Sequence, residues 1–212
     1  MNILGVEILG DASGVFVALD GVHIGTLVLS DSIKDGAPVA VAQLRDLGVE
    51  STVILSGDRR ESVKSVAGSV GIEEYYSELS PEEKYAALEK IIEGSKSTLY
   101  VGDGINDAPS LARADVGIAM GALGADSAIE SADVVIMSDE LERIPEAVRI
   151  SRKTLKIAKQ NIVFALTVKL AVMILGALNL ANMWLAVFAD VGVSVIAILN
   201  AMRTLGTPRG KK

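Results

Sequence analysis

The pattern of apolar and polar positions divides the chain into three regions. Residues 1–23 alternate between apolar and polar side chains around the turn residues Gly14 and Asp20-Gly21, which predicts a β-hairpin. From residue 24 to about residue 140, short apolar runs alternate with amphipathic stretches. Beyond that point the apolar runs become much longer. We therefore expect a small hairpin, an α/β domain and a helical region.

The middle region predicts a Rossmann-like α/β fold, a parallel sheet with helices on both faces. Apolar strands that alternate with helices are typical of a parallel sheet buried between two layers. One helix start is explicit, because Ser80 is placed as an N-cap and Glu83 completes a capping box. The expected strands are residues 24–29, 52–55, 98–101, 116–120 and 134–137, and the expected helices are residues 38–47, 61–70, 81–92, 108–113 and 126–131.

The last region contains two apolar runs that are each long enough to cross a bilayer. Residues 161–181 contain a single charge, Lys169, and residues 183–202 contain a single charge, Asp190. About 20 predominantly apolar residues span the hydrocarbon core as a helix. The runs predict a transmembrane helical hairpin with a turn at residues 179–182. The alternative is a buried helical hairpin in a soluble protein.

Charge is distributed unevenly along the chain, whose net charge is −7. Every acidic residue except Asp190 lies at or before Glu146, which argues against nucleic acid as a partner. The turn between the apolar runs has no Lys or Arg, whereas both outer flanks are basic. The positive-inside rule then predicts a multi-pass protein, expected in the plasma membrane, with both ends in the cytoplasm. The chain has no cysteine, which excludes disulfides and thiolate metal sites.

Polar residues follow two of the predicted strands at the same edge of the sheet. Strand 98–101 leads into Gly102-Asp103-Gly104-Ile105-Asn106-Asp107. Carboxyl ends of parallel strands are where open α/β sheets place their ligands. Asp103 and Asp107 are suited to share a Mg²⁺ ion, and Gly102 and Gly104 allow the backbone to approach closely. The alternative is a turn in which Asp107 caps the next helix.

A second polar segment predicts binding of phosphate at this edge. Strand 52–55 leads into Ser56-Gly57-Asp58, whose hydroxyl and backbone N–H groups can form a phosphate cradle. Lys84 lies in the first turn of its predicted helix, where a cation opposes the helix dipole and indicates a nearby anion. A hydroxyl, a lysine and paired carboxylates are the components of a Mg²⁺-dependent phosphoryl-transfer site.

These motifs resemble those of P-type ATPases, members of the haloacid-dehalogenase-like superfamily. Residues 102–109 are similar to the hinge motif of that family, Ser56-Gly57-Asp58 resembles its Thr-Gly-Asp element, and the segment from Ser80 to Lys84 resembles the one with its phosphate-binding lysine. The resemblance implies that Asp103 and Asp107 serve Mg²⁺, that Lys84 neutralises the phosphoryl group and that Ser56 hydrogen-bonds it. The implied catalytic set is Ser56, Gly57, Asp58, Lys84, Asn106 and Asp107, and the implied Mg²⁺ loop contains Gly102, Asp103, Gly104 and Asp107.

The apolar runs resemble those of the zinc/cadmium/lead-exporting branch of that family. The resemblance rests on Asn161 with Lys169 eight residues later, and on Asp190-Val191-Gly192 in the second run. A charge inside the membrane is costly and is a functional hypothesis by default. The resemblance implies that Asp190 coordinates the exported Zn²⁺, Cd²⁺ or Pb²⁺, that Lys169 is a built-in counter-charge and that Asn161 belongs to the same site. The alternative is a structural ion pair that stabilises the hairpin.

The resemblance covers nearly all of this chain but only about the last third of the family. The family's phosphorylated aspartate, in Asp-Lys-Thr-Gly-Thr, does not occur in these residues. We therefore expect no phospho-aspartate from this chain alone, and ATP binding through a missing domain. The expected organisation is a nucleotide-domain remnant (1–23), the back half of a phosphorylation domain (24–140), a connecting cytoplasmic helix (141–160), the transmembrane hairpin (161–203) and a basic tail (204–212).

The expected function is therefore a part of an ATP-driven heavy-metal efflux pump, with any remaining half supplied by a longer or separate chain. One alternative is a membrane-anchored, Mg²⁺-dependent phosphatase of the same superfamily with Asp31 as its nucleophile. Another is a non-catalytic partner or remnant of a transporter. Lys169 and Asp190 favour the transporter, because a simple anchor has no use for charges inside the membrane.

Overall fold

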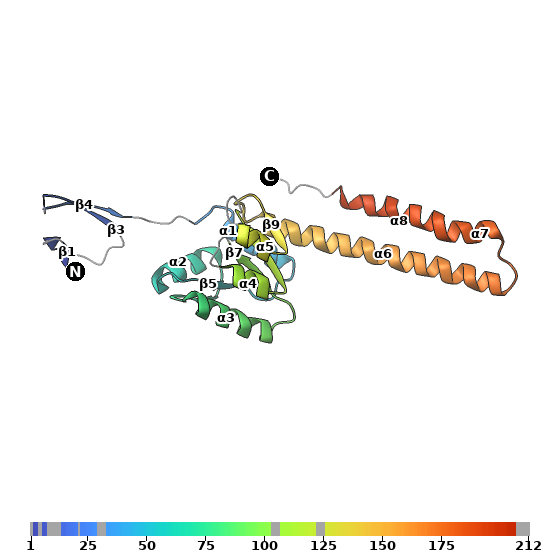
Figure 1. The fold of residues 1–212 in the computed structure, drawn as a ribbon, viewed down its shortest axis with the longest axis horizontal. Helices are drawn as coiled ribbons and strands as arrows, with labels where there is room; N and C mark the ends of the chain where they lie inside the picture. The colour runs from blue at the N-terminus through green and yellow to red at the C-terminus, as the bar shows by residue number, and fades with distance from the viewer. Residues whose placement is uncertain are drawn as a thin grey trace. The chain divides into compact units, whose positions relative to one another are not determined.

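The computed structural model describes residues 2–3, 6–7, 14–20, 22–28, 33–102, 107–121 and 126–206 of the chain. It divides into two compact units, Met1–Asp35 and Gly36–Lys212 (Figure 1). Each unit is described by itself below.

The first unit consists of antiparallel strand pairs. Its elements are β1 (Asn2–Ile3), β2 (Val6–Glu7), β3 (Gly14–Leu19) and β4 (Val22–Val28). β3 and β4 form the predicted hairpin, in which Asp20 adopts a φ of 49° at the turn. The strand expected at residues 24–29 forms, but it is the second arm of this hairpin and not the first strand of the α/β sheet. The division between units accordingly falls after Asp35 instead of after residue 23.

The second unit contains the predicted α/β elements with small shifts at their ends. The helices are α1 (Ala37–Asp46), α2 (Arg60–Val70), α3 (Pro81–Gly94), α4 (Ala108–Arg113) and α5 (Asp126–Ser131). The strands are β5 (Val53–Leu55), β6 (Glu74–Tyr76), β7 (Leu99–Gly102), β8 (Val116–Met120) and β9 (Val134–Ile136). Only β6 escaped prediction, since Glu74-Tyr75-Tyr76 has neither an apolar run nor a clear alternation.

The strands are parallel and form two separate ladders. β5 pairs with β6, and β7, β8 and β9 pair in that order. Between them, β5 and β7 share no ladder within the part of the chain that the structure describes. Among the described residues, β5 and β7 therefore each have one unpaired edge. Ser56 directly follows β5, and Gly102 is the last residue of β7.

Both faces of the three-stranded ladder are covered, as the apolar strands predicted. On one face Ile118 and Met120 of β8 pack with Ile144 and partly buried Leu44 from α1. On the other face Ala119 packs with Leu111 of α4. The alternation along β8 thus directs successive side chains into two different helix layers.

The start of α3 has the predicted capping box. The Ser80 hydroxyl accepts a hydrogen bond from the Glu83 backbone N–H at 3.2 Å, and the Glu83 carboxylate accepts one from the Ser80 N–H at 2.8 Å. The bond from the Ser80 backbone N–H lowers the pKa of Glu83 below its ordinary value, and the Ser80 side chain adds a smaller lowering. Because the capping box orients the first turn of α3, it also positions the next residue, Lys84.

The connecting helix and the first apolar run form one continuous helix, α6 (Arg143–Ala177), of 35 residues. The chain then turns at Asn179, with a φ of 57°, and Asn182 caps the next helix by accepting a bond from the Leu185 N–H at 2.9 Å. This second run consists of α7 (Met183–Val187), the π-helix η2 (Phe188–Gly192), α8 (Val193–Ala201) and the 3₁₀-helix η3 (Met202–Thr204).

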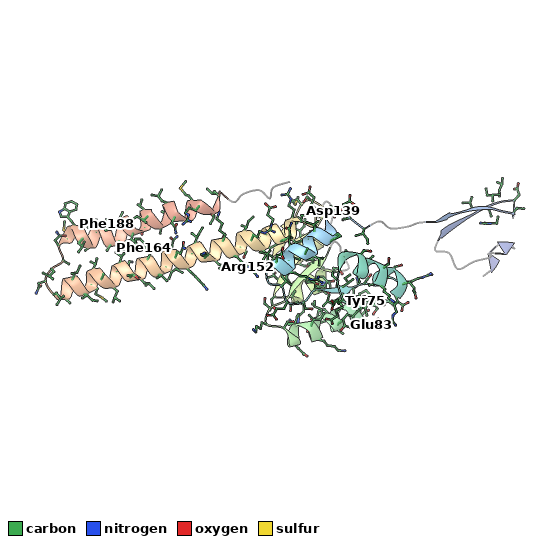
Figure 2. The ribbon with its side chains drawn as sticks, turned by 180° about the vertical axis from the view of Figure 1, so that it is seen from behind. Tyr75, Glu83, Asp139, Arg152, Phe164 and Phe188 are labelled. Atoms are coloured by element: carbon green, nitrogen blue, oxygen red, sulfur yellow. The ribbon has the colours of Figure 1, made fainter. Side chains whose placement is uncertain are left out.

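The two long helices lie side by side as an antiparallel hairpin (Figure 1). Both α6 and residues 183–204 are long and apolar enough to cross a membrane, by length and composition. In their most apolar windows, 0% and 11% of the residues are buried. Apolar side chains project outward over most of the hairpin (Figure 2). Such exposure differs from the alternative of a hairpin buried inside a soluble protein, whose apolar side chains would be covered.

Candidate functional site

The Asp107 carboxylate lies at the carboxyl edge of β7 and is directed toward Lys84. Its Oδ1 lies 3.7 Å from Lys84 Nζ and accepts a hydrogen bond from the Tyr100 hydroxyl at 3.1 Å. The side chains of Lys84 and Asp107 are 23% and 14% exposed. Asp107 occupies the N-cap position of α4, but its side chain makes no capping bond. The helix-cap alternative therefore does not account for this carboxylate.

Gly102 permits the close approach that this arrangement needs. A Cβ atom at the position of Gly102 would lie 2.8 Å from the Asp107 Cβ, closer than real Cβ contacts allow. Gly102 itself is buried at the end of β7. The predicted site residues Asp103, Gly104 and Asn106 lie outside the described residues, so the pairing of Asp103 with Asp107 on one Mg²⁺ stays a prediction.

The Ser56-Gly57-Asp58 loop folds onto itself beside the segment that leads to α3. Ser56 Oγ donates to Asp58 Oδ2 at 2.8 Å and accepts from the Asp58 N–H at 3.1 Å. A Cβ at Gly57 would lie 3.1 Å from the Leu79 carbonyl oxygen, and the Leu79 N–H donates to the Ser56 carbonyl at 3.1 Å. Within the described chain, Ser56 has no hydrogen bond to Lys84 or Asp107.

The Asp107 carboxylate is an anion close to Lys84, as the position of Lys84 in the first turn of α3 indicated. No cluster of three or more His, Cys, Asp or Glu side chains suited to a metal occurs among the residues that the structure describes. Tyr100 was missed by the sequence reasoning. Its signal was a lone phenol in an apolar strand two residues before Gly102, which places a polar atom beside the loop.

The two charges of the helical hairpin meet as an ion pair. Lys169 Nζ lies 3.5 Å from Asp190 Oδ1, and the two side chains are 59% and 76% exposed. The structure brings the pair together, with more than half of each side chain exposed.

Asp190 lies in the middle of the π-helix η2. Its carbonyl accepts a hydrogen bond from Ser194 Oγ at 2.8 Å. A Cβ at Gly192 would lie 2.5 Å from the Phe188 ring, so glycine leaves the space that the ring occupies. Short π-helices are rare and frequently occur at functional sites. The sequence signal for this one was Gly192, two residues after an aspartate in an apolar run.

Asn161 lies at a different level of the hairpin from the ion pair. Its Nδ2 donates to the Ala197 carbonyl at 3.0 Å, and its Oδ1 accepts from Asn200 Nδ2 at 2.8 Å. Eight residues separate Asn161 from Lys169, a rise of about 12 Å along a helix. The structure therefore does not bring together all three residues predicted for the transported ion.

Comparisons with known proteins agree with these motifs. The family model of haloacid dehalogenase-like hydrolases matches residues 6–115. The chain is 48% identical over 194 residues to the cadmium, zinc and cobalt-transporting ATPase of Bacillus subtilis (strain 168), covering 90% of this chain and 28% of the relative. It is 49% identical over 191 residues to a zinc-transporting ATPase of Synechocystis sp., covering 89% and 26%.

A solved structure extends the similarity to the fold. The crystal structure of a zinc-transporting PIB-type ATPase in the E2.Pi state superposes with a TM-score of 0.79 at 36% identity, covering 90% of this chain and 31% of that one. The match includes more residues than the α/β domain alone has, so it extends into the helical hairpin. This chain spans less than a third of the length of these matched proteins.

Proposed function

Since the chain belongs to the haloacid dehalogenase-like hydrolase family, we propose that it forms part of an ATP-driven pump that exports divalent heavy-metal cations. The observation that carries the proposal is the presence of two lysine–aspartate pairs in one chain. One pair lies at the sheet edge and the other lies on two helices long and apolar enough to cross a membrane. A phosphatase needs only the first pair. A pump that couples phosphorylation to ion movement needs both.

The sheet edge supplies the Mg²⁺ and phosphate half of a phosphoryl-transfer site. Asp107 fits a Mg²⁺ ligand because its carboxylate makes no helix-capping bond and is directed to the edge, and Asp103 is proposed as its companion. Bound Mg²⁺ would neutralise charge on the phosphoryl oxygens. Lys84 adds a second positive charge, and the Ser56 hydroxyl exchanges its bond to Asp58 for one to the phosphoryl group. Gly57 and Asp58 form the loop after β5, and Asn106 is proposed to belong to the same site.

The unpaired edges of β5 and β7 support a phosphate acceptor that comes from elsewhere. An apolar parallel strand between them would end beside Ser56 and Gly102. We propose that such a strand, from a longer or a separate chain, carries the phosphorylated aspartate. The same missing part would bind ATP. This arrangement explains why a chain with less than a third of its relatives' length is expected to be inactive alone.

The hairpin supplies part of the membrane ion site. Asp190 is proposed to bind the exported ion, and the 3.5 Å approach of Lys169 supports its role as a counter-charge once the ion has left. The relatives are described as transporting zinc, cadmium and cobalt, and we propose zinc, cadmium or lead as the cargo here. Both ends and the α/β domain are proposed to face the cytoplasm from a multi-pass position in the plasma membrane.

A chimera tests the proposal directly. The 194 matched residues of the Bacillus subtilis ATPase are replaced by those of this chain, and the product is expressed in metal-sensitive cells. We expect restored zinc or cadmium tolerance and metal-stimulated ATP hydrolysis, both lost in Asp190→Asn and Lys84→Ala. Thr167→Val is the matched membrane control, because that hydroxyl bonds only within its own helix. A chimera that inserts and hydrolyses ATP without any response to metal would contradict the proposal.

The phosphatase alternative has its own discriminating variant. Asp31, its required nucleophile, lies outside the described residues. If the 212-residue chain hydrolysed a generic phosphomonoester with Mg²⁺, and Asp31→Asn abolished that activity, the phosphatase function would replace the pump. We expect no such hydrolysis.

A further inference from the structure

The two helices of the hairpin pack through a narrow apolar seam. Its residues recur at spacings of three and four, which is the pattern of helices that contact along one face. Between residues 161 and 200, the less exposed positions on α6 are Asn161, Ala165, Val168, Val172 and Leu175, and on the second helix they are Leu185, Ala189, Gly192, Val193, Ala197 and Asn200. Most side chains of this seam are small or medium-sized, which lets the helix backbones approach closely.

Between residues 161 and 200, the polar side chains of this seam are Asn161 and Asn200. They bond to each other at 2.8 Å, and Asn161 also donates to the Ala197 carbonyl at 3.0 Å. Arg203 donates to Asn200 Oδ1 at 3.0 Å, which leaves the Asn200 amide group oriented toward Asn161. The contacts therefore involve a chain of three side chains and one backbone carbonyl across the two helices.

A single polar pair in an apolar seam restricts how two helices can slide. Moving α8 by one turn, about 5.4 Å, would separate the asparagines and break both interhelical hydrogen bonds of Asn161. The apolar positions cannot discriminate registers in this way, because they repeat along both helices. Lys169 and Asp190 restrict sliding less, since both are more than half exposed and the lysine side chain is long and flexible.

We propose that Asn161 and Asn200 form a polar clasp that sets the register of α8 against α6 and so holds Asp190 opposite Lys169. Asn161 is then a positioning residue and not a ligand of the transported ion. The two contacts lie about 12 Å apart along α6, so together they align the helices at two levels. The existence of the clasp is independent of the proposed function, and only its consequence for the ion rests on that function.

Cysteine cross-linking of the whole chain in membrane vesicles measures this register. The 212 residues contain no cysteine, so an engineered pair is the only one present. Because residue 161 meets residues 197 and 200, and residue 169 meets residue 190, residue 165 is expected opposite residue 193. Ala165→Cys is combined in turn with Val193→Cys as the in-register pair, and with Ala189→Cys or Ala197→Cys as pairs displaced by one turn.

In the parent chain we expect the 165/193 pair to form a disulfide fastest under mild oxidation. Asn161→Leu and, separately, Asn200→Leu should lower the ratio of 165/193 to displaced cross-links by about threefold for each interhelical hydrogen bond lost. The double variant should change the ratio no more than Asn161→Leu does, because the two residues act together. Thr167→Val, which removes a hydroxyl outside the seam, should leave the ratio unchanged.

Unchanged ratios in both leucine variants would overturn the clasp and assign the register to the turn at Asn179–Asn182. Two single variants are used so that the test still holds if one of them inserts poorly into the vesicle membrane. The ratio of 165/193 to displaced cross-links is measured only on the membrane-inserted chain. The assay contains neither metal nor ATP. A chimera that fails to transport therefore refutes the proposed function without touching the clasp, and an unchanged cross-linking ratio refutes the clasp alone.

Discussion

The Lys84–Asp107 pair and the Lys169–Asp190 pair use the same two residue types at nearly the same distance, 3.7 Å and 3.5 Å. The first is mostly buried and receives a further bond from Tyr100, whereas the second lies exposed between two helices. Short helices and strands with two covered faces position the first pair. Only helix register positions the second. Pairs of identical chemistry can therefore depend on opposite kinds of support, one on local packing and the other on the alignment of long elements.

The largest difference between the two pairs is expected when the Lys169–Asp190 pair is broken. Lys169→Leu leaves the Asp190 carboxylate without a partner in an apolar environment, and we expect a loss of about 2.5–3.5 kcal/mol in the stability of the inserted hairpin. The double variant Lys169→Leu/Asp190→Leu should recover most of it, because no charge is then left unpaired. Unfolding of the vesicle-inserted or micelle-bound chain by a denaturing detergent measures both. Additive losses in the double variant would contradict a coupled pair.

The packed support of the first pair is tested by Gly102→Ala. The added Cβ would lie 2.8 Å from the Asp107 Cβ, so we expect a destabilisation of about 1–3 kcal/mol and a displaced Asp107. Thermal unfolding of the chain measures the first effect. Gly68→Ala is the matched control, since a Cβ added at Gly68 would have no atom within 4 Å. Gly68 lies inside α2, and alanine is more stable than glycine in a helix interior by about 0.5–1 kcal/mol. Equal behaviour of the two variants would refute the close approach.

Tyr100→Phe removes the hydrogen bond from the Tyr100 hydroxyl to Asp107 and keeps the aromatic ring, so it tests the local support of the Lys84–Asp107 pair. Asp107 then loses the donor that orients its Oδ1, and we expect the Mg²⁺ concentration for half-maximal phosphorylation of the chimera to rise about threefold to tenfold. The maximal rate at saturating Mg²⁺ should change less. An unchanged Mg²⁺ requirement, with folding intact, would show that Tyr100 does not position this carboxylate.

The smallest effect concerns the capping box that begins the helix of Lys84. The pKa of Glu83 is lowered in the folded chain by its bonds to Ser80, so its contribution to stability is present above the ordinary value of 4.5. That contribution is lost as the pH falls through the lower folded pKa. Glu83→Gln should retain the cap and remove this pH dependence. Thermal unfolding measured between pH 6 and pH 3 compares the two chains, and parallel curves would contradict the linkage.

Local signals in the sequence predicted much of this molecule. Ser80, Pro81 and Glu83 specify the start of α3 through contacts within four residues, and the apolar runs at 116–120 and 161–181 specify a buried strand and a long apolar helix. The Gly102–Asp107 motif indicated one candidate site, and Lys169 and Asp190 indicated the other, because charged residues at strand ends and in apolar runs are recognisable without coordinates.

Other features depend on contacts between distant residues and had no such signal. The assignment of β4 to the hairpin depended on which strand it pairs with, and β6 depended on a neighbour, β5, because its own three residues form no apolar run or alternation. The partners of Tyr100 and Asn161 depended on which side chains the fold brings within hydrogen-bonding reach. The sequence by itself determined the elements and the charged residues, since those follow from interactions along a few turns or alternations. Only the tertiary structure decided the pairings, because a hydrogen bond between residues 161 and 200 depends on the relative position of two helices, which no local pattern encodes.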